Sequence, residues 1–127
     1  MPHVLIVDDE PGIRFALKRW FERQHWTVAE AGDGQQAFTM LLDSDDSGAS
    51  RIDVVVCDLH LPLISGDDLL RRLAAERPAL VERVILSTGD SVDDAPPDSP
   101  FATHPYVLQK PFDLASLRAL VQSITAP

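Results

Sequence analysis

Short apolar runs recur along this chain, and four of them end abruptly at charged or reactive residues. The runs are residues 4–7, 54–57, 84–86 and 107–108, and they are followed by Asp8, Asp58, Ser87-Thr88 and Gln109-Lys110. Short β-branched runs bounded by polar residues are typical of buried strands in a parallel sheet. Residues 27–31 predict one more strand, with a turn at residues 32–34 after it.

Between the strands, apolar residues recur at the spacing of one helix face. Pro11 suits the first turn of the first predicted helix, and residues 37–42 carry a second helical face. Ser65 is the expected N-cap of a helix that ends before Pro78, and Asp113 is the expected N-cap of the last helix. Because strands and helices alternate, the chain is predicted to be an α/β protein.

Two polar segments interrupt this alternation. Residues 91–105 contain prolines at positions 96, 97, 100 and 105, which leave no room for a long regular helix. Residues 43–51 are polar and have no periodicity. They lack the glycine and the terminal glutamate of a calcium-binding loop, so a solvated connector is the better interpretation.

Composition narrows the possible functions. The 127 residues fit one domain, and the net charge of −9 argues against binding to nucleic-acid phosphates or to an anionic membrane. Cys57 has no partner for an internal disulfide and is interpreted as a small buried hydrophobe, which suits a reducing compartment. Without a signal-peptide core or a run of roughly 18 apolar residues, the expected location is the cytoplasm.

The polar residues after the strands predict one common site, because ligands of parallel α/β sheets gather at the carboxyl ends of the strands. The residues expected there are Asp8, Asp9, Asp58, Thr88 and Lys110. Clustered carboxylates repel one another unless a hard cation such as Mg²⁺ lies between them. A carboxylate can also accept a phosphoryl group as a nucleophile. Taken separately, the acids after the first strand could merely complement a helix dipole.

Four motifs resemble those of a known family. They are Val7-Asp8-Asp9-Glu10, Asp58-Leu59-His60-Leu61-Pro62 with Gly66, Ser87-Thr88-Gly89, and Lys110-Pro111-Phe112. In this order and at these separations, they are similar to the receiver domain of bacterial two-component response regulators, including the chemotaxis-regulator type. The resemblance runs from about His3 to Ile124, so residues 1–127 are expected to form a single receiver domain. The separation of Thr88 and Lys110 is similar to that in receivers attached to, or working with, hybrid sensor kinases.

The resemblance implies both a fold and a function. The fold is a doubly wound, five-stranded parallel sheet of order 2-1-3-4-5, here with an irregular or shortened fourth helix. In a Mg²⁺-dependent reaction, Asp58 would accept a phosphoryl group from a histidine of a sensor kinase or of a histidine phosphotransfer protein. The domain would then switch binding to an effector protein in two-component phosphorelay signalling. It would be a phosphoacceptor and not a stand-alone enzyme.

The resemblance also implies the metal ligands. Asp9 would bind Mg²⁺ directly and Asp8 largely through water, and Asp58 and the backbone carbonyl of His60 would complete the set. The side chain of His60 would flank the site and tune the access of water, with phosphoryl relay and metal binding as the alternatives.

Thr88 and Lys110 would contact the phosphoryl oxygens, and the Lys110–Pro111 peptide bond would be cis. The other histidines, His3, His25 and His104, have no ligand spacing and are expected on the surface or in the core. Trp20 and Trp26 are expected to pack in the core or at a helix end.

The chain departs from the family at its output face. The usual switch aromatic lies three residues before the lysine, where this chain has Val107, while Tyr106 is one position earlier and should face the other way. Residues 91–105 replace most of the normal fourth helix. We therefore expect phosphorylation to order residues 91–105 for a partner, in place of a threonine–aromatic coupling.

Two other functions fit part of the pattern. A pseudo-receiver that only binds proteins would explain the altered output face, but it would not need every phosphorylation residue. A small Mg²⁺-dependent phosphatase of the haloacid dehalogenase kind also uses an aspartyl nucleophile. It would need a second acid where this chain has His60, and a cap domain as well.

Overall fold

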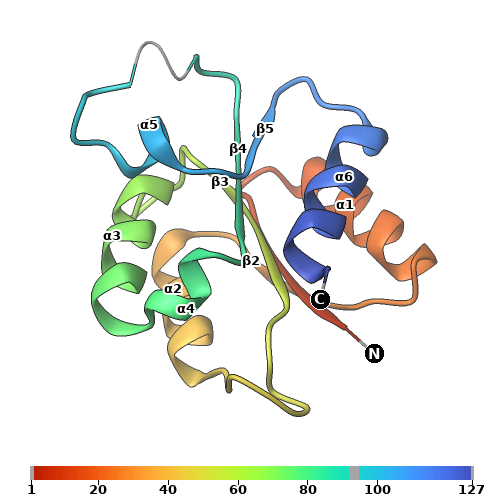
Figure 1. Ribbon diagram of the computed structural model, residues 1–127. Coiled ribbons are helices and arrows are strands. Elements are labelled where there is room, and N and C mark those ends of the chain that lie inside the picture. The colour runs from red at the N-terminus through yellow and green to blue at the C-terminus, as the bar shows by residue number, and fades with distance from the viewer. Residues whose placement is uncertain (1, 92–94, 127) are drawn as a thin grey trace.

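The computed structural model describes residues 2–91 and 95–126 of the chain. Five parallel strands form one sheet in the predicted order, β2-β1-β3-β4-β5 (Figure 1). They are β1 (His3–Val7), β2 (Thr27–Ala31), β3 (Val54–Asp58), β4 (Val84–Thr88) and β5 (Val107–Gln109). The central strands β1, β3 and β4 are buried almost throughout, which explains their uninterrupted apolar sequences.

Helices cover both faces of the sheet, which confirms the doubly wound α/β class. In the described residues they are α1 (Pro11–Arg23), α2 (Gly34–Asp43), α3 (Gly66–Glu76), α4 (Pro78–Val81), α5 (Pro100–Thr103) and α6 (Leu114–Thr125). α1 and α6 lie on one face, and α2 and α3 lie on the other together with the short helices α4 and α5 (Figure 1). Each face has its own hydrophobic core, with Phe21 and Leu117 in one and Leu41 and Leu73 in the other.

An aromatic cluster fills the core beneath α1. The ring of Phe21 lies 4.9 Å from that of Trp20 and 5.2 Å from that of Trp26, edge to face in both cases. Such pairs add about 0.5–1.5 kcal/mol beyond the burial of apolar area. Both tryptophans therefore pack in the core, as predicted.

Three helices begin at side-chain caps. Asp33, Ser65 and Asp113 each accept a hydrogen bond from the backbone N–H three residues further on, at the start of α2, α3 and α6. The turn predicted at residues 32–34 is shorter than expected, because Gly34 already belongs to α2. A side chain at Gly34 has no room, since its Cβ would lie 2.0 Å from the carbonyl oxygen of Ile64.

The segment between β4 and β5 contains only a short helix, as its prolines predict. α5 has four residues and begins at Pro100, and the side chain of Phe101 is buried in the core beside α3. The prediction of an irregular or shortened helix is confirmed for residues 95–105, while residues 92–94 lie outside the described residues. α4, which begins at Pro78 directly after α3, was not predicted from the sequence.

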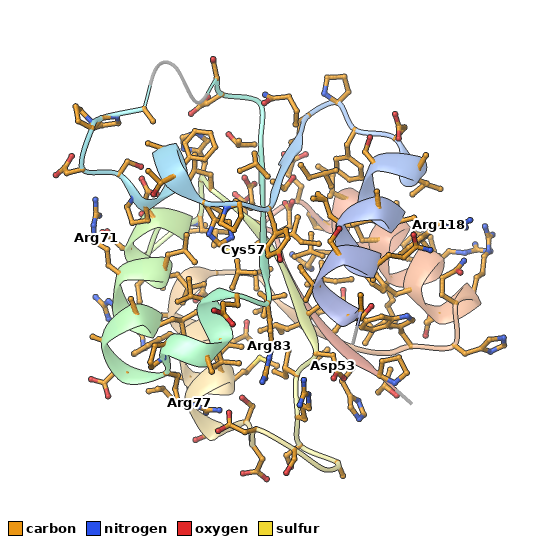
Figure 2. The ribbon with its side chains drawn as sticks, viewed as in Figure 1. Asp53, Cys57, Arg71, Arg77, Arg83 and Arg118 are labelled. Carbon is orange, nitrogen blue, oxygen red and sulfur yellow. The ribbon has the colours of Figure 1, made fainter. Side chains whose placement is uncertain are left out.

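The polar loop of residues 43–51 lies at the amino ends of the strands, away from the predicted site. The guanidinium of Arg77 donates to two carbonyl oxygens at the end of α2 and to the carboxylate of Asp46, at 2.7 Å. This bond to Arg77 lowers the pKa of Asp46. Figure 2 shows Arg77, Arg83 and Asp53 at the same end of the molecule. The loop is therefore a connector held by ion pairs.

Candidate functional site

The predicted site lies at the edge of the sheet formed by the carboxyl ends of the strands. Parallel pairing aligns β1 with β3, β3 with β4 and β4 with β5 close to their last residues. The polar residues that end or follow these strands are Asp8, Asp58, Thr88 and Lys110. Asp8, Asp58 and Thr88 are only 2%, 6% and 1% exposed, so their polar groups are largely removed from water.

Lys110 connects the two buried aspartates. Its Nζ atom lies 3.4 Å from Oδ2 of Asp58 and 3.5 Å from Oδ2 of Asp8. Burial by itself would lower the pKa of Lys110, but the carboxylates of Asp58 and Asp8 outweigh burial and raise it. Lys110 therefore remains protonated and offsets part of the carboxylate charge. Its peptide bond to Pro111 is cis, as the resemblance implied.

The surroundings of Asp8 oppose its charge. Burial raises the pKa of Asp8, and the charges of Asp58 and Glu10 act in the same direction. The backbone N–H of Glu10, 2.9 Å from Oδ1 of Asp8, and the ammonium of Lys110 lower the pKa but do not cancel the increase. The guanidinium of Arg14 holds the end of β1 by donating to the carbonyl oxygen of Asp8 at 2.6 Å.

Asp9 and Glu10 extend this acidic group to the surface. Both side chains are exposed, and the carboxylate oxygens of Asp8, Asp9 and Glu10 lie within 4.8 Å of one another. In the described part of the chain, these are the carboxylates grouped closely enough to hold a metal ion together. The resemblance implied Asp58 and the carbonyl of His60 as ligands. In this structure, the carboxylate of Asp58 contacts Lys110, and Glu10 joins the acidic group.

Thr88 is tied to the loop that follows β4. Its Oγ1 accepts a hydrogen bond from the backbone N–H of Asp90 at 3.0 Å. The side-chain amide of Gln109 donates to the carbonyl oxygens of Thr88 and Asp90, at 3.2 Å and 3.0 Å. Asp90 and Gln109 were not predicted from the sequence to belong to the site. Gln109 ends β5 and Asp90 follows the end of β4, so the search for polar residues at the carboxyl ends of strands could have found both.

His60 lies beside the phosphoacceptor candidate. Its backbone N–H donates to Oδ1 of Asp58 at 3.2 Å, and its Nε2 lies 2.6 Å from Oδ2 of Asp90. The side chains of His60 and Asp90 are both more than half exposed. The imidazole therefore flanks the site and joins the loop after β3 to the loop after β4. Its influence on water access remains a prediction.

A close contact between backbones fixes the loop after Asp58. The N–H of Gly66 donates to the carbonyl oxygen of Leu59 at 2.8 Å. A Cβ atom at Gly66 would lie 2.8 Å from Cα of Leu59 and 2.9 Å from the carbonyl oxygen of Asp58. Any larger residue at this position would push α3 away from the site.

The other titratable residues singled out in the sequence are not among the polar groups that meet at the site. Cys57 is buried in the interior (Figure 2), and burial, followed by the charges of Asp58 and Asp8, raises the pKa of its thiol. It is thus a buried hydrophobe, as predicted. His25 is exposed, whereas His3 and His104 are half-buried.

Comparison with known proteins agrees with this geometry. The chain matches the response regulator receiver domain over residues 4–122. It is 34% identical to the probable transcriptional regulatory protein TcrX of Mycobacterium tuberculosis, over 94% of this chain and 49% of TcrX. The chain belongs to the response regulator receiver domain family. The chain spans about half the length of the curated relatives that it matches.

Solved receiver structures share the fold. A response regulator receiver protein from Pseudomonas putida is 30% identical, with 96% of each chain covered and a TM-score of 0.78. The response regulator protein TrrA from Thermotoga maritima, in complex with Mg²⁺ and BeF, is 25% identical over 98% of this chain and 99% of that chain, with a TM-score of 0.79. The family match leaves the phosphatase alternative without support.

Val107 and Tyr106 lie on opposite faces of the sheet, as the sequence predicted. Val107 packs against the core beside α3, whereas Tyr106 packs against the core beside α6. The two side chains therefore face opposite sides of the sheet, as expected for neighbours on a strand.

In the described residues, no helix combines the length and the apolar character needed to cross a membrane.

Proposed function

We propose that this receiver domain accepts a phosphoryl group on Asp58 from a phosphohistidine of a sensor kinase or of a histidine phosphotransfer protein. The observation that carries the proposal is the position of Asp58 at the end of β3, between β1 and β4. Acids follow β1, Thr88 ends β4, and Nζ of Lys110 lies 3.4 Å from Asp58 and 3.5 Å from Asp8. Among the described acids of this edge, Asp58 alone lies on the strand between β1 and β4.

The chemistry is a single displacement at phosphorus. A carboxylate oxygen of Asp58 attacks the phosphorus, the phosphorus–nitrogen bond to the histidine breaks, and the nitrogen keeps the electron pair. Lys110, with its Nζ 3.4 Å from Asp58, would offset the charge on the phosphoryl oxygens. The hydroxyl of Thr88 could donate to one of these oxygens while a lone pair still accepts from Asp90.

The acidic group beside Asp58 fits a divalent cation. Carboxylate oxygens are the ligands that Mg²⁺ prefers. Burial, and to a smaller extent the charges of Asp58 and Glu10, raise the pKa of Asp8, and a cation beside this group would stabilise its charged form. We propose Asp8, Asp9, Asp58 and the carbonyl of His60 as the protein ligands. When bound, Mg²⁺ would neutralise charge between these acids and the incoming phosphoryl group.

In this proposal the domain is a phosphoacceptor that switches protein binding, and not a stand-alone enzyme. Residues 1–127 would act as one cytoplasmic receiver unit in a two-component phosphorelay. Its partners would be the phosphodonor protein and an effector protein. The net charge of −9 favours neither nucleic acid nor an anionic membrane as a direct partner.

Mass spectrometry after incubation with a small phosphodonor and Mg²⁺ tests the proposal. The wild-type domain should gain one phosphate, and Asp58→Asn should gain none. Asp68→Asn is the matched control, because Asp68 is an exposed acid that pairs only with Arg71 in the bonds described. Equal labelling of Asp58→Asn and Asp68→Asn would contradict the assignment of Asp58.

A further inference from the structure

The carboxylate of Asp67 joins α3 to α5 across a long stretch of sequence. Its Oδ2 accepts a hydrogen bond from the hydroxyl of Ser99, and its Oδ1 accepts one from the backbone N–H of Phe101 at 2.9 Å. Ser99 and Phe101 are buried, with exposures of 4% and 2%. Asp67 itself is half-buried, so both bonds are partly shielded from water, and hydrogen bonds to a charged acceptor are stronger than neutral ones.

α5 depends on this contact for its structure. It has four residues, and Ser99, its N-cap, makes no capping bond to the helix from its own side chain. A helix this short does not persist alone in water, because its first turn fixes many dihedral angles for few hydrogen bonds. Asp67 satisfies a free N–H of the first turn from outside the helix, and Phe101 anchors the same turn in the core beside α3.

Asp67 is also close in structure to the phosphoacceptor loop. It follows Gly66, whose N–H donates to the carbonyl oxygen of Leu59, the residue after Asp58. A cavity of about 190 Å³ separates this loop from α5. The residues that line it include Leu59, His60, Asp67, Asp90, Ser99 and Phe101. Two bridges border this cavity: the His60–Asp90 pair and the bonds from Asp67 to α5.

We propose that Asp67 is a positioning residue that couples the phosphoacceptor loop to α5. Movement of the loop after Asp58 would reach Asp67 through Gly66 and change how firmly α5 is held. The coupling step rests on the proposed phosphorylation of Asp58, whereas the anchoring of α5 does not. The sequence led us to expect that phosphorylation orders residues 91–105. α5 is already held by Asp67 in this structure, so α5 itself does not need phosphorylation to become ordered.

Amide hydrogen exchange of the unmodified protein tests the anchoring. Asp67→Ala should speed exchange of the amides of residues 101–104 by about tenfold or more, because two charge-assisted hydrogen bonds to the first turn of α5 are lost. Asp68→Asn, one residue away and exposed, should leave these amides unchanged. Ser99→Ala, which removes one of the two bonds, should have an intermediate effect and covers the case in which Asp67→Ala fails to fold. Wild-type exchange in both Ser99→Ala and Asp67→Ala would overturn the anchoring.

The same amides, measured with beryllofluoride and Mg²⁺ as the phosphoryl mimic, test the coupling. The mimic should change their exchange by about fivefold or more in the wild type and in Asp68→Asn, within the usual range of coupling between sites. In Asp67→Ala this response should disappear, although a small phosphodonor should still label Asp58. Because coupling is reciprocal, Asp67→Ala should also alter the affinity for the mimic.

The outcomes separate this inference from the proposed function. An unchanged response to the mimic in Asp67→Ala, with Asp58 still labelled, would overturn the coupling alone. Failure of the wild type to be labelled on Asp58 would overturn the proposed function, and the coupling with it. The anchoring of α5 would still be judged by exchange in the unmodified protein.

Discussion

The two faces of the sheet hold their helices by different means. On the face covered by α1 and α6, two long helices bury apolar stripes, and Phe21 packs between two tryptophan rings. On the opposite face, the connection before β5 is the four-residue helix α5, held by Phe101 and by the carboxylate of Asp67. On the first face, α1 and α6 are held by many apolar contacts. On the second face, α2 and α3 also bury apolar residues, but α5 depends on a few contacts beside the site and is therefore the better place for a response.

The largest effect expected from this comparison comes from truncating one aromatic ring on each face. Phe21→Ala should lower the free energy of unfolding by about 3–5 kcal/mol, because a fully buried ring is lost from the core. Phe101→Ala should cost less, since α5 can open locally while the rest stays folded. Denaturant unfolding measures both costs. Equal losses would contradict the difference between the faces.

A smaller effect is expected at the cap of α3. Ser65→Ala should cost about 0.5–2 kcal/mol, because the N–H of Asp68 loses its acceptor. Fraying of this turn should also loosen Asp67, so the amides of residues 101–104 should exchange faster. Asp113→Ala, which removes the cap of α6, should leave those amides unchanged. Equal exchange at residues 101–104 in both variants would show that α5 does not depend on the first turn of α3.

Removing the negative charge of Asp8, at the carboxyl ends of the strands, should stabilise the metal-free protein. Asp8→Asn should raise the free energy of unfolding by about 1 kcal/mol, because the buried carboxylate no longer has to carry a charge there. The pKa of Asp8 is raised in the folded state, so its ionisation lowers stability as pH rises through that value. Asp9→Asn should change stability less, because Asp9 is exposed.

Thermal unfolding with and without Mg²⁺ measures this effect. Excess Mg²⁺ should stabilise the wild type more than Asp8→Asn, which reverses or reduces the advantage of the variant. An equal shift with Mg²⁺ in both proteins would exclude Asp8 from the metal site.

The smallest effect concerns pH and the segment that follows α5. Burial lowers the pKa of His104, although the carbonyl oxygen of Val84, 2.5 Å from its Nε2, partly opposes this. Between the lowered pKa of the folded state and about pH 6.5, the unfolded chain therefore binds a proton that the folded state does not. Stability should fall as the pH falls through this range. His104→Gln should flatten this slope, and His25→Asn at the exposed turn should not. The same slope in wild type and His104→Gln would show that another group is responsible.

The sequence by itself determined the elements and the edge at which the chemistry lies. Apolar runs and helical periodicity are local signals, so they predicted the five strands and the long helices. The polar residues after the runs then predicted the shared edge, because parallel strands end on the same side of a sheet. The family motifs added the strand order and the cis bond before Pro111. α4 was missed because four residues are too few to establish a period.

Only the tertiary structure decided which polar side chains meet. Lys110 lies between Asp58 and Asp8, His60 contacts Asp90, and Asp67 reaches Ser99 and Phe101 across 32 and 34 positions. In the sequence, Asp67 is simply an acid in the first turn of a helix, where it would complement the helix dipole. It instead bonds to a second helix because the packing of α3 against α5 brings a buried hydroxyl and a free N–H to its carboxylate. Such contacts depend on how the elements are placed in three dimensions, and no local pattern in the sequence encodes that placement.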